Sequence, residues 1–190
     1  MYHIKDDKRC EKSTELIISS VMELTKEKTL NEITISDVQE RSTVSRATFY
    51  RNFDELIDVM RLLCDRGFNA ILSEFTYSND MEVTDIAEQV YRYWYVHSDI
   101  LEALVACNRT DILYSSMHEY VKKLDVFSWL TDNNRSVDYL VSIISYGMIG
   151  IIVNWVEHGK KEGMHELKVH LREAFEMMAT VGIFLKEETN

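Results

Sequence analysis

Two arginines, a threonine and a tyrosine, all of them able to form hydrogen bonds through their side chains, lie within residues 46–51. Arg46, Thr48, Tyr50 and Arg51 fall inside these six positions. An arginine guanidinium can bond both acceptors on the major-groove edge of guanine, and a threonine offers a hydroxyl and a methyl group that suit thymine. A tyrosine hydroxyl can bond a phosphate oxygen. This combination indicates contact with duplex DNA, so the elements around it must present it on one exposed face.

The pattern of residues 33–53 predicts two short helices joined by a sharp corner at 42–44. Ser45 is a good N-cap for the second helix, and either Thr34 or Ser36 can cap the first. The apolar positions that we expect to face inward and hold the pair together are Val38, Val44, Phe49 and Phe53. We expect DNA contacts first from Arg46, Thr48 and Tyr50, and second from Ser36, Ser45, Arg51 and Asn52.

Residues 44–53, VSRATFYRNF, resemble the recognition region of the TetR/AcrR family, which reads roughly V-S-R-x-T-F-Y-R-x-F. The resemblance is strongest over residues 12–59. It implies an all-α fold, with an N-terminal three-helix DNA-binding domain that contains a helix-turn-helix. A C-terminal domain of about six helices would follow, dimerise through a four-helix bundle and bind an inducer. The run 146–159, YGMIGIIVNWVEHG, resembles the dimerisation helix of one C-terminal subgroup.

Three positions depart from the family pattern. The family usually has a small residue where Gln39 stands and a glycine where Thr43 stands, because the helices cross closely and the turn favours a left-handed backbone. Leu56, in an acidic stretch, replaces a frequent phosphate-contacting lysine. We therefore expect fewer phosphate contacts within the same fold.

The composition favours helices, and the charge is unevenly distributed along the chain. The 190 residues include no proline and six glycines, so little material exists for the tight turns of β-rich folds. The net charge is −11, yet residues 1–53 carry nine basic and nine acidic side chains, whereas residues 54–190 carry twelve and twenty-three. We therefore expect a DNA-binding domain at 1–53, whose binding is salt-sensitive, and an acidic effector-binding and dimerisation domain at 54–190.

Beyond the corner pair, apolar periodicity predicts helices at 9–28, 54–76, 83–97, 99–107 and 110–130, followed by a loop at 132–135. Two further helices carry apolar residues at alternating spacings of three and four. The expected dimer contacts along them are Val141, Ile144, Met148, Ile151, Trp155, Leu167, Leu171, Ala174, Met178 and Val181. A short capped turn at 157–163 should make the two helices antiparallel neighbours.

The first of these two helices also permits a membrane interpretation. Residues 139–156 contain no charged side chain and are long enough for a marginal membrane span. Asp138 and Glu157 flank the run, and no positive-inside asymmetry appears. A soluble homodimer helix, with no membrane contact, is the favoured interpretation.

Aromatic and polar side chains crowd two of the predicted helices and could line a pocket for a small molecule. The candidates are Tyr91, Trp94, Tyr95, Tyr114, Met117, His118 and Trp129. Aromatic side chains at helical spacing also build plain core, so the pocket is a hypothesis. The acidic body favours a cationic or neutral ligand.

Catalytic and metal-binding patterns are missing from the sequence. Glu166 and His170 lie one helical turn apart without a third ligand nearby, and no Gly-rich phosphate loop occurs. Cys10, Cys64 and Cys107 are far apart and fit small buried side chains better than a thiol sensor. We expect no enzyme, no cofactor, no metal and a cytoplasmic location.

Together these features predict a dimeric DNA-binding transcriptional regulator with a palindromic operator. We expect a repressor that an unknown small-molecule effector releases. Two alternatives stay open: a regulator or activator without a ligand, and a helical protein-interaction or membrane-attached module.

Overall fold

The computed structural model describes residues 1–5, 7–74, 83–124 and 135–187, and its long elements are all helices. They are α1 (Lys8–Leu24), α2 (Ile35–Ser42), α3 (Arg46–Asn52), α4 (Ile57–Glu74), α5 (Val83–Val96), α6 (Ser98–Ala106), α7 (Thr110–Lys122), α8 (Arg135–Glu157) and α9 (Met164–Glu187). A 3-10 turn, η1 (Leu30–Glu32), links α1 to α2. The all-α prediction is confirmed.

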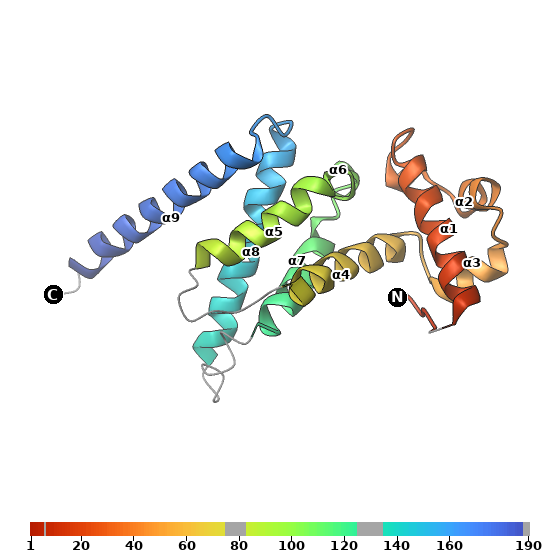
Figure 1. Cartoon of the computed structure of the whole chain (residues 1–190), viewed down its shortest axis with the longest axis horizontal. Helices are drawn as coiled ribbons and strands as arrows, with labels where there is room; N and C mark the ends of the chain where they lie inside the picture. Colours follow the sequence, from red (N-terminus) through yellow and green to blue (C-terminus); the bar gives the residue numbers. More distant parts are fainter. Residues whose placement is uncertain (6, 75–82, 125–134, 188–190) are drawn as a thin grey trace.

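The helices form a head, a connecting lever and a body (Figure 1). Helices α1, α2 and α3 pack together at one end of the molecule. Helix α4 runs from this head into the body, where it packs against α7, and α7 in turn packs against α8. The head is therefore joined to the body by α4 and by a second contact between η1 and α6.

Several helix boundaries differ from the sequence prediction. Helix α1 ends at Leu24 because the amide of Lys26 donates to the carbonyl of Glu23, which tightens the chain into a turn. Helix α4 begins at Ile57, and the buried carboxylate of Asp58, rather than Asp54, accepts the amide of Glu55 at 2.9 Å.

Helix α7 ends at Lys122, because the amide of Lys123 donates to the carbonyl of Tyr120 at 3.0 Å and closes a turn. The predicted helix 110–130 is therefore too long, and its residues 125–130 lie outside the described residues. Arg135, predicted to lie in a loop, is instead the first residue of α8. The rest of that predicted loop, 132–134, is also outside the description.

The predicted dimer contacts of α8 lie on the face that builds the chain's own core. Val141, Met148 and Trp155 are only 2–5% exposed, and α8 packs against α7 and α6 along this face. Ile144 and Ile151 are partly buried against the same core. The prediction that these residues meet a partner is therefore wrong for the buried three, because α6 and α7 of the same chain already cover them.

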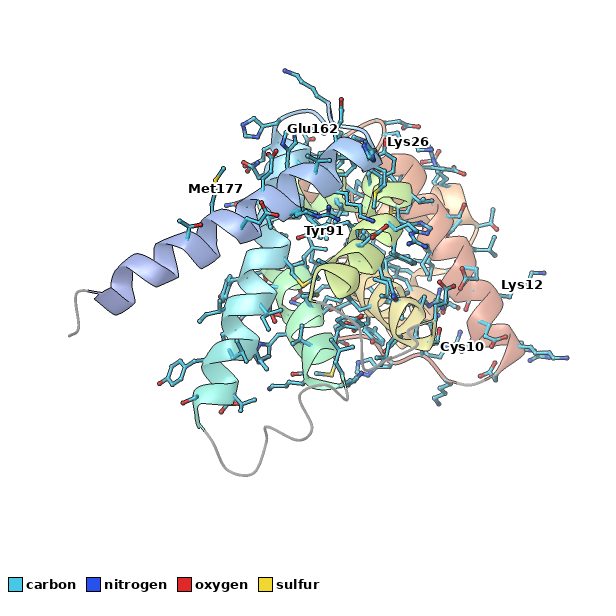
Figure 2. All side chains as sticks on the ribbon, turned by 60° about the vertical axis from the view of Figure 1, so that its left-hand side comes forward. Cys10, Lys12, Lys26, Tyr91, Glu162 and Met177 are labelled. Carbon is cyan, nitrogen blue, oxygen red and sulfur yellow. The ribbon has the colours of Figure 1, made fainter. Side chains whose placement is uncertain are left out.

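Helix α9 does not pack along α8. The two helices diverge from the turn that joins them, and α9 packs against α5, where Lys168 pairs with Glu88 at 2.5 Å (Figure 1). Leu167 and Leu171 are buried, whereas Ala174 is exposed. The side chains of Met178 and Val181 lie outside the described residues. Figure 2 shows Met177 on the part of α9 that extends away from the body.

The opposite face of α8 is apolar and exposed. Tyr139, Ile143 and Tyr146 are 71%, 63% and 61% exposed, and Gly147 and Gly150 lie on the same open side. By length and composition, the segment Ser136–Glu157 could cross a membrane. A third of its most apolar stretch is buried inside the protein. Such an exposed apolar surface is typical of an interaction site.

Candidate nucleic-acid interface

The corner between α2 and α3 is built from capping residues and one left-handed residue. Thr34 caps α2, accepting the amide of Asp37 at 3.2 Å, and Ser45 caps α3, accepting the amide of Thr48 at 3.2 Å. Thr43 ends α2 with φ 59°. A β-branched residue is uncommon there, so the chain forms the corner at some cost in backbone strain.

The apolar side chains of the helix pair face inward as predicted. Val38, Val44, Phe49 and Phe53 are between 0% and 8% exposed. The rings of Phe49 and Phe53 lie 5.6 Å apart between their centroids. This packing fixes the orientation of α3 and leaves its other face to solvent.

The exposed face of α3 carries the predicted hydrogen-bonding groups. Arg46 and Arg51 are exposed, and Tyr50 is 49% exposed. The Arg51 guanidinium donates to the Thr48 hydroxyl at 2.9 Å, and that hydroxyl lies 3.0 Å from the hydroxyl of Ser45. Ser36 is exposed on α2. The arrangement offers two guanidinium groups and a phenol on one surface, as a major-groove reader requires.

Asn52 faces the interior of the head, unlike the other predicted DNA contacts. Its side chain is 1% exposed and donates to the hydroxyls of Ser13 at 3.2 Å and Thr14 at 3.3 Å, both on α1. It follows Phe49 by three residues, about one helical turn, so it shares the inward face. The structure therefore corrects this prediction: Asn52 fastens α3 to α1 and is not available to DNA.

A small basic groove borders the end of α3. It has a volume of about 360 Å³; Lys5, Arg9 and Arg51 contribute three cations to its lining, and Asp7 contributes one carboxylate. Lys5 and Arg9 are four residues apart in the sequence, and the fold brings Arg51 beside them. Three cations around one groove suit a phosphate oxygen.

Residues 1–5, which we name the N-terminal strap, run beside the end of α3. Tyr2 pairs with Phe53 in an isolated antiparallel bridge, and its hydroxyl donates to Asp65 on α4 at 2.7 Å. Burial and the hydrogen bond to Asp65 together raise the pKa of Tyr2 to about 12. No local sequence signal marks this contact, because the two residues are 63 positions apart.

Comparison with known proteins assigns the chain to a family. Residues 81–176 match the family model TetR_C_8, described as the C-terminal region of a transcriptional regulator. The chain belongs to the TetR family of transcriptional regulators. No curated protein matches it.

Solved structures share the fold of this TetR-family regulator. The crystal structure of Lin0861 from Listeria innocua superposes with a TM-score of 0.75 at 16% identity, covering 93% of this chain and 96% of that one. A transcriptional regulator of the TetR/AcrR family from Aquifex aeolicus gives a TM-score of 0.59 at 16% identity, over 87% and 99%. A TetR transcriptional regulator from Streptococcus agalactiae gives 0.58 at 19% identity, over 86% and 93%.

The predicted effector residues of this TetR-family regulator fall into separate groups. Tyr95 stacks on Trp155 and Tyr114 stacks on Tyr146, with centroids 5.1 Å and 3.6 Å apart, so both tyrosines contact α8. The Tyr91 hydroxyl donates to the carbonyl of Met148 at 3.4 Å. Trp129 lies outside the described residues.

Trp94 belongs to an aromatic cluster between α4, α5 and α7. The ring of Phe68 lies 5.2 Å from Trp94 and 5.6 Å from Tyr120, measured between centroids. Among the described residues, the buried Trp94 Nε1 and Tyr120 Oη of this cluster have no hydrogen-bond partner, nor does His118 Nδ1 elsewhere on α7. Met117, on α7, is buried. Phe68 was not among the predicted contacts, because an isolated aromatic residue on a helix carries no ligand signal.

Metal binding finds no support among the residues that the structure describes. In that part of the chain, no group of three or more His, Cys, Asp or Glu side chains is placed to hold an ion. Cys64 and Cys107 are buried, and Cys10 is partly exposed. Burial raises the pKa of the Cys64 and Cys107 thiols, which opposes formation of the reactive thiolate.

Proposed function

We propose that this TetR-family regulator is a homodimeric, cytoplasmic repressor that binds a palindromic operator and is released by a small molecule. The single observation that carries the DNA-binding part is the exposed face of α3, where Arg46, Tyr50 and Arg51 project from a helix whose other face is buried. Two such helices, about 34 Å apart in a dimer, would enter successive major grooves. A regulator without a ligand is the competing interpretation.

The DNA experiment selects a duplex from a random pool with the wild-type protein and measures its affinity by fluorescence anisotropy. We expect binding that weakens steeply as salt rises, since phosphate contacts release counterions. A protein that enriches no duplex at low salt would contradict the proposal.

The partner subunit contacts the exposed face of α8 in this proposal, centred on Tyr139, Ile143 and Tyr146. No charged residue interrupts residues 139–156, so water is an unfavourable neighbour for this surface. A Cβ at Gly147 or Gly150 would have no neighbouring atom within 4 Å, so a second helix can approach closely there. The exposed Ala174 on α9 can extend the same interface.

A matched pair of substitutions on α8 tests the dimer. Ile143→Glu places a charge on the exposed face, and we expect a folded monomer by light scattering. Met148→Glu places a charge in the core, where Met148 is 4% exposed, and we expect a loss of stability above about 3 kcal/mol. A dimer that survives Ile143→Glu would place the interface elsewhere, and a protein that sediments with lipid vesicles would favour the membrane interpretation.

The effector in this proposal is a planar, uncharged molecule with a hydrogen-bond acceptor. Trp94 Nε1 can only donate, and it lies buried beside Phe68 and Tyr120 with no acceptor among the described residues. Burial raises the pKa of Tyr120 to about 12 and also raises that of Tyr91, so these surroundings oppose a charged group. The acidic body had favoured a cation or a neutral molecule, and the aromatic cluster favours the neutral one.

Three isosteric probes separate the ligand classes by thermal shift. Benzamide is neutral and offers an acceptor, benzamidinium is cationic without one, and benzoate is anionic. We expect benzamide alone to raise the melting temperature, and we expect Trp94→Phe to weaken its binding about fivefold through one lost hydrogen bond. Preference for benzamidinium would instead indicate a cation site among the aromatic rings.

A further inference from the structure

The N-terminal strap follows the end of the recognition helix through two backbone hydrogen bonds. The amide of His3 donates to the carbonyl of Asn52 at 2.8 Å, and the amide of Asp54 donates to the carbonyl of Met1 at 3.1 Å. Asn52 is the last residue of α3. Any movement of the strap therefore acts directly on the end of the helix that faces DNA.

The Tyr2 side chain of the same strap is fastened to the body through one carboxylate. The Tyr2 hydroxyl donates to Asp65 Oδ2 at 2.7 Å, and the Ser116 hydroxyl donates to Asp65 Oδ1 at 2.6 Å. Asp65 lies on α4 and Ser116 on α7, where Ser116 is 8% exposed. Hydrogen bonds to an ionised acceptor are short and about twice as strong as neutral ones. One side chain thus joins the strap, the lever and the body.

We propose that Asp65 is a positioning residue through which α7 controls the placement of α3 on DNA. The path runs from Ser116 through Asp65 to Tyr2 and, by the strap, to Asn52. A shift of α7 along α4 pulls the Ser116 hydroxyl away from the carboxylate, which then no longer holds Tyr2 in place. This device goes beyond the proposed repressor function, because it concerns how the body controls the head whatever the ligand is.

The fastened strap should strengthen DNA binding because it orders α3 in advance. A fastened strap holds α3 rigid before it meets DNA, so less conformational freedom is lost on binding. Releasing the strap weakens DNA affinity. Two other ties reach the lever without α7. Glu15 pairs with Arg66 at 2.6 Å, but this pair is exposed and contributes little by comparison. The Met1 ammonium donates to the buried Asp58 carboxylate at 2.8 Å, so the Asp65 contact controls the Tyr2 part of the strap while Met1 stays bound to α4.

Hydrogen exchange tests the path without any DNA. Ser116→Ala removes the hydroxyl on α7, and Ser115→Ala is the matched control, because the Ser115 hydroxyl donates to a carbonyl of its own helix. We expect the amides of His3 and Asp54 to exchange about fivefold faster in Ser116→Ala and in Tyr2→Phe, and at the wild-type rate in Ser115→Ala. Unchanged exchange at these two amides in Ser116→Ala would overturn the proposal.

A double-mutant cycle then tests the effect on DNA binding, with a duplex that the wild-type protein selects from a random pool. Tyr2 and Ser116 act through the same carboxylate, so we expect each single substitution to weaken affinity about fivefold and the double substitution to add little. Fully additive losses would show two independent effects and overturn the path. If the wild type selects no duplex, the repressor function fails, while the exchange experiment still decides the fate of the strap.

Discussion

Replacing Asn52 with alanine separates a structural role from a role in reading DNA. The side chain donates two hydrogen bonds to α1, at 3.2 Å and 3.3 Å, and accepts a weak one from the Cys10 thiol at 3.5 Å. An intramolecular hydrogen bond contributes about 1 kcal/mol net, and leaving the buried Thr14 hydroxyl without its amide partner adds to the loss. We expect Asn52→Ala to lower the free energy of unfolding by about 2–3 kcal/mol.

The assay is urea unfolding followed by circular dichroism, with all proteins at the same concentration because dimers unfold in a concentration-dependent way. For a chain of this length, each 1 kcal/mol lowers the melting temperature by about 2–4 °C. Arg51→Ala is the matched control: it changes the neighbouring, exposed residue and should alter stability by less than about 0.5 kcal/mol.

The two roles make opposite predictions for DNA. If Asn52 only fastens α3 to α1, the ratio of affinities for a selected and a random duplex stays the same in Asn52→Ala. A variant that unfolds like the wild type but loses this ratio would refute the reasoning and restore Asn52 as a base contact.

Three further predictions concern the head and the lever. Arg46→Ala should cost about 1–3 kcal/mol of binding to a selected duplex at unchanged melting temperature; equal losses on selected and random duplexes would make Arg46 a phosphate contact. Gly67→Ala should destabilise the protein by about 1 kcal/mol in thermal unfolding. The Cβ of the new alanine would lie 2.8 Å from Tyr93 Cε1, and this crowding outweighs the gain in helix propensity. A stability equal to wild type would contradict this prediction. The Asp37 carboxyl accepts a hydrogen bond from Lys28 at 2.6 Å, and its pKa is lowered to about 2. The stability that this carboxyl contributes is therefore present above about pH 4 and is lost as the pH falls towards about 2. A carboxyl that titrates near about pH 4 by NMR would exclude this ion pair.

Local patterns predicted the head well because its contacts are short in sequence. The caps at Thr34 and Ser45, the inward positions of Val38 and Phe49 and the corner at Thr43 all depend on neighbours within about ten residues. The family resemblance lies in the same stretch. Asn52 shows the limit, since only its contact with α1 distinguishes a buried amide from an exposed one.

The body was harder to predict because its helices are apolar on more than one face. Helix α8 carries apolar residues all round, so periodicity identified a helix but not which face meets α7 and which is left open. The spacing of Met148 and Trp155 fits a dimer seam and a core equally well. The divergence of α9 from α8 likewise depends on its packing against α5, which no local pattern encodes.

The sequence by itself determined that this chain is helical, that its first third contains a helix-turn-helix with Arg46 and Tyr50 on its outer surface, and that its negative charge lies in the body. Those properties follow from backbone propensity, periodicity and composition, which act over one or two helical turns. The tertiary structure alone decided that Asn52 is buried, that the open face of α8 is the one with Ile143, and that Asp65 joins the strap to α7. These are contacts between residues tens of positions apart, and only the complete packing of the helices brings them within hydrogen-bond or van der Waals distance.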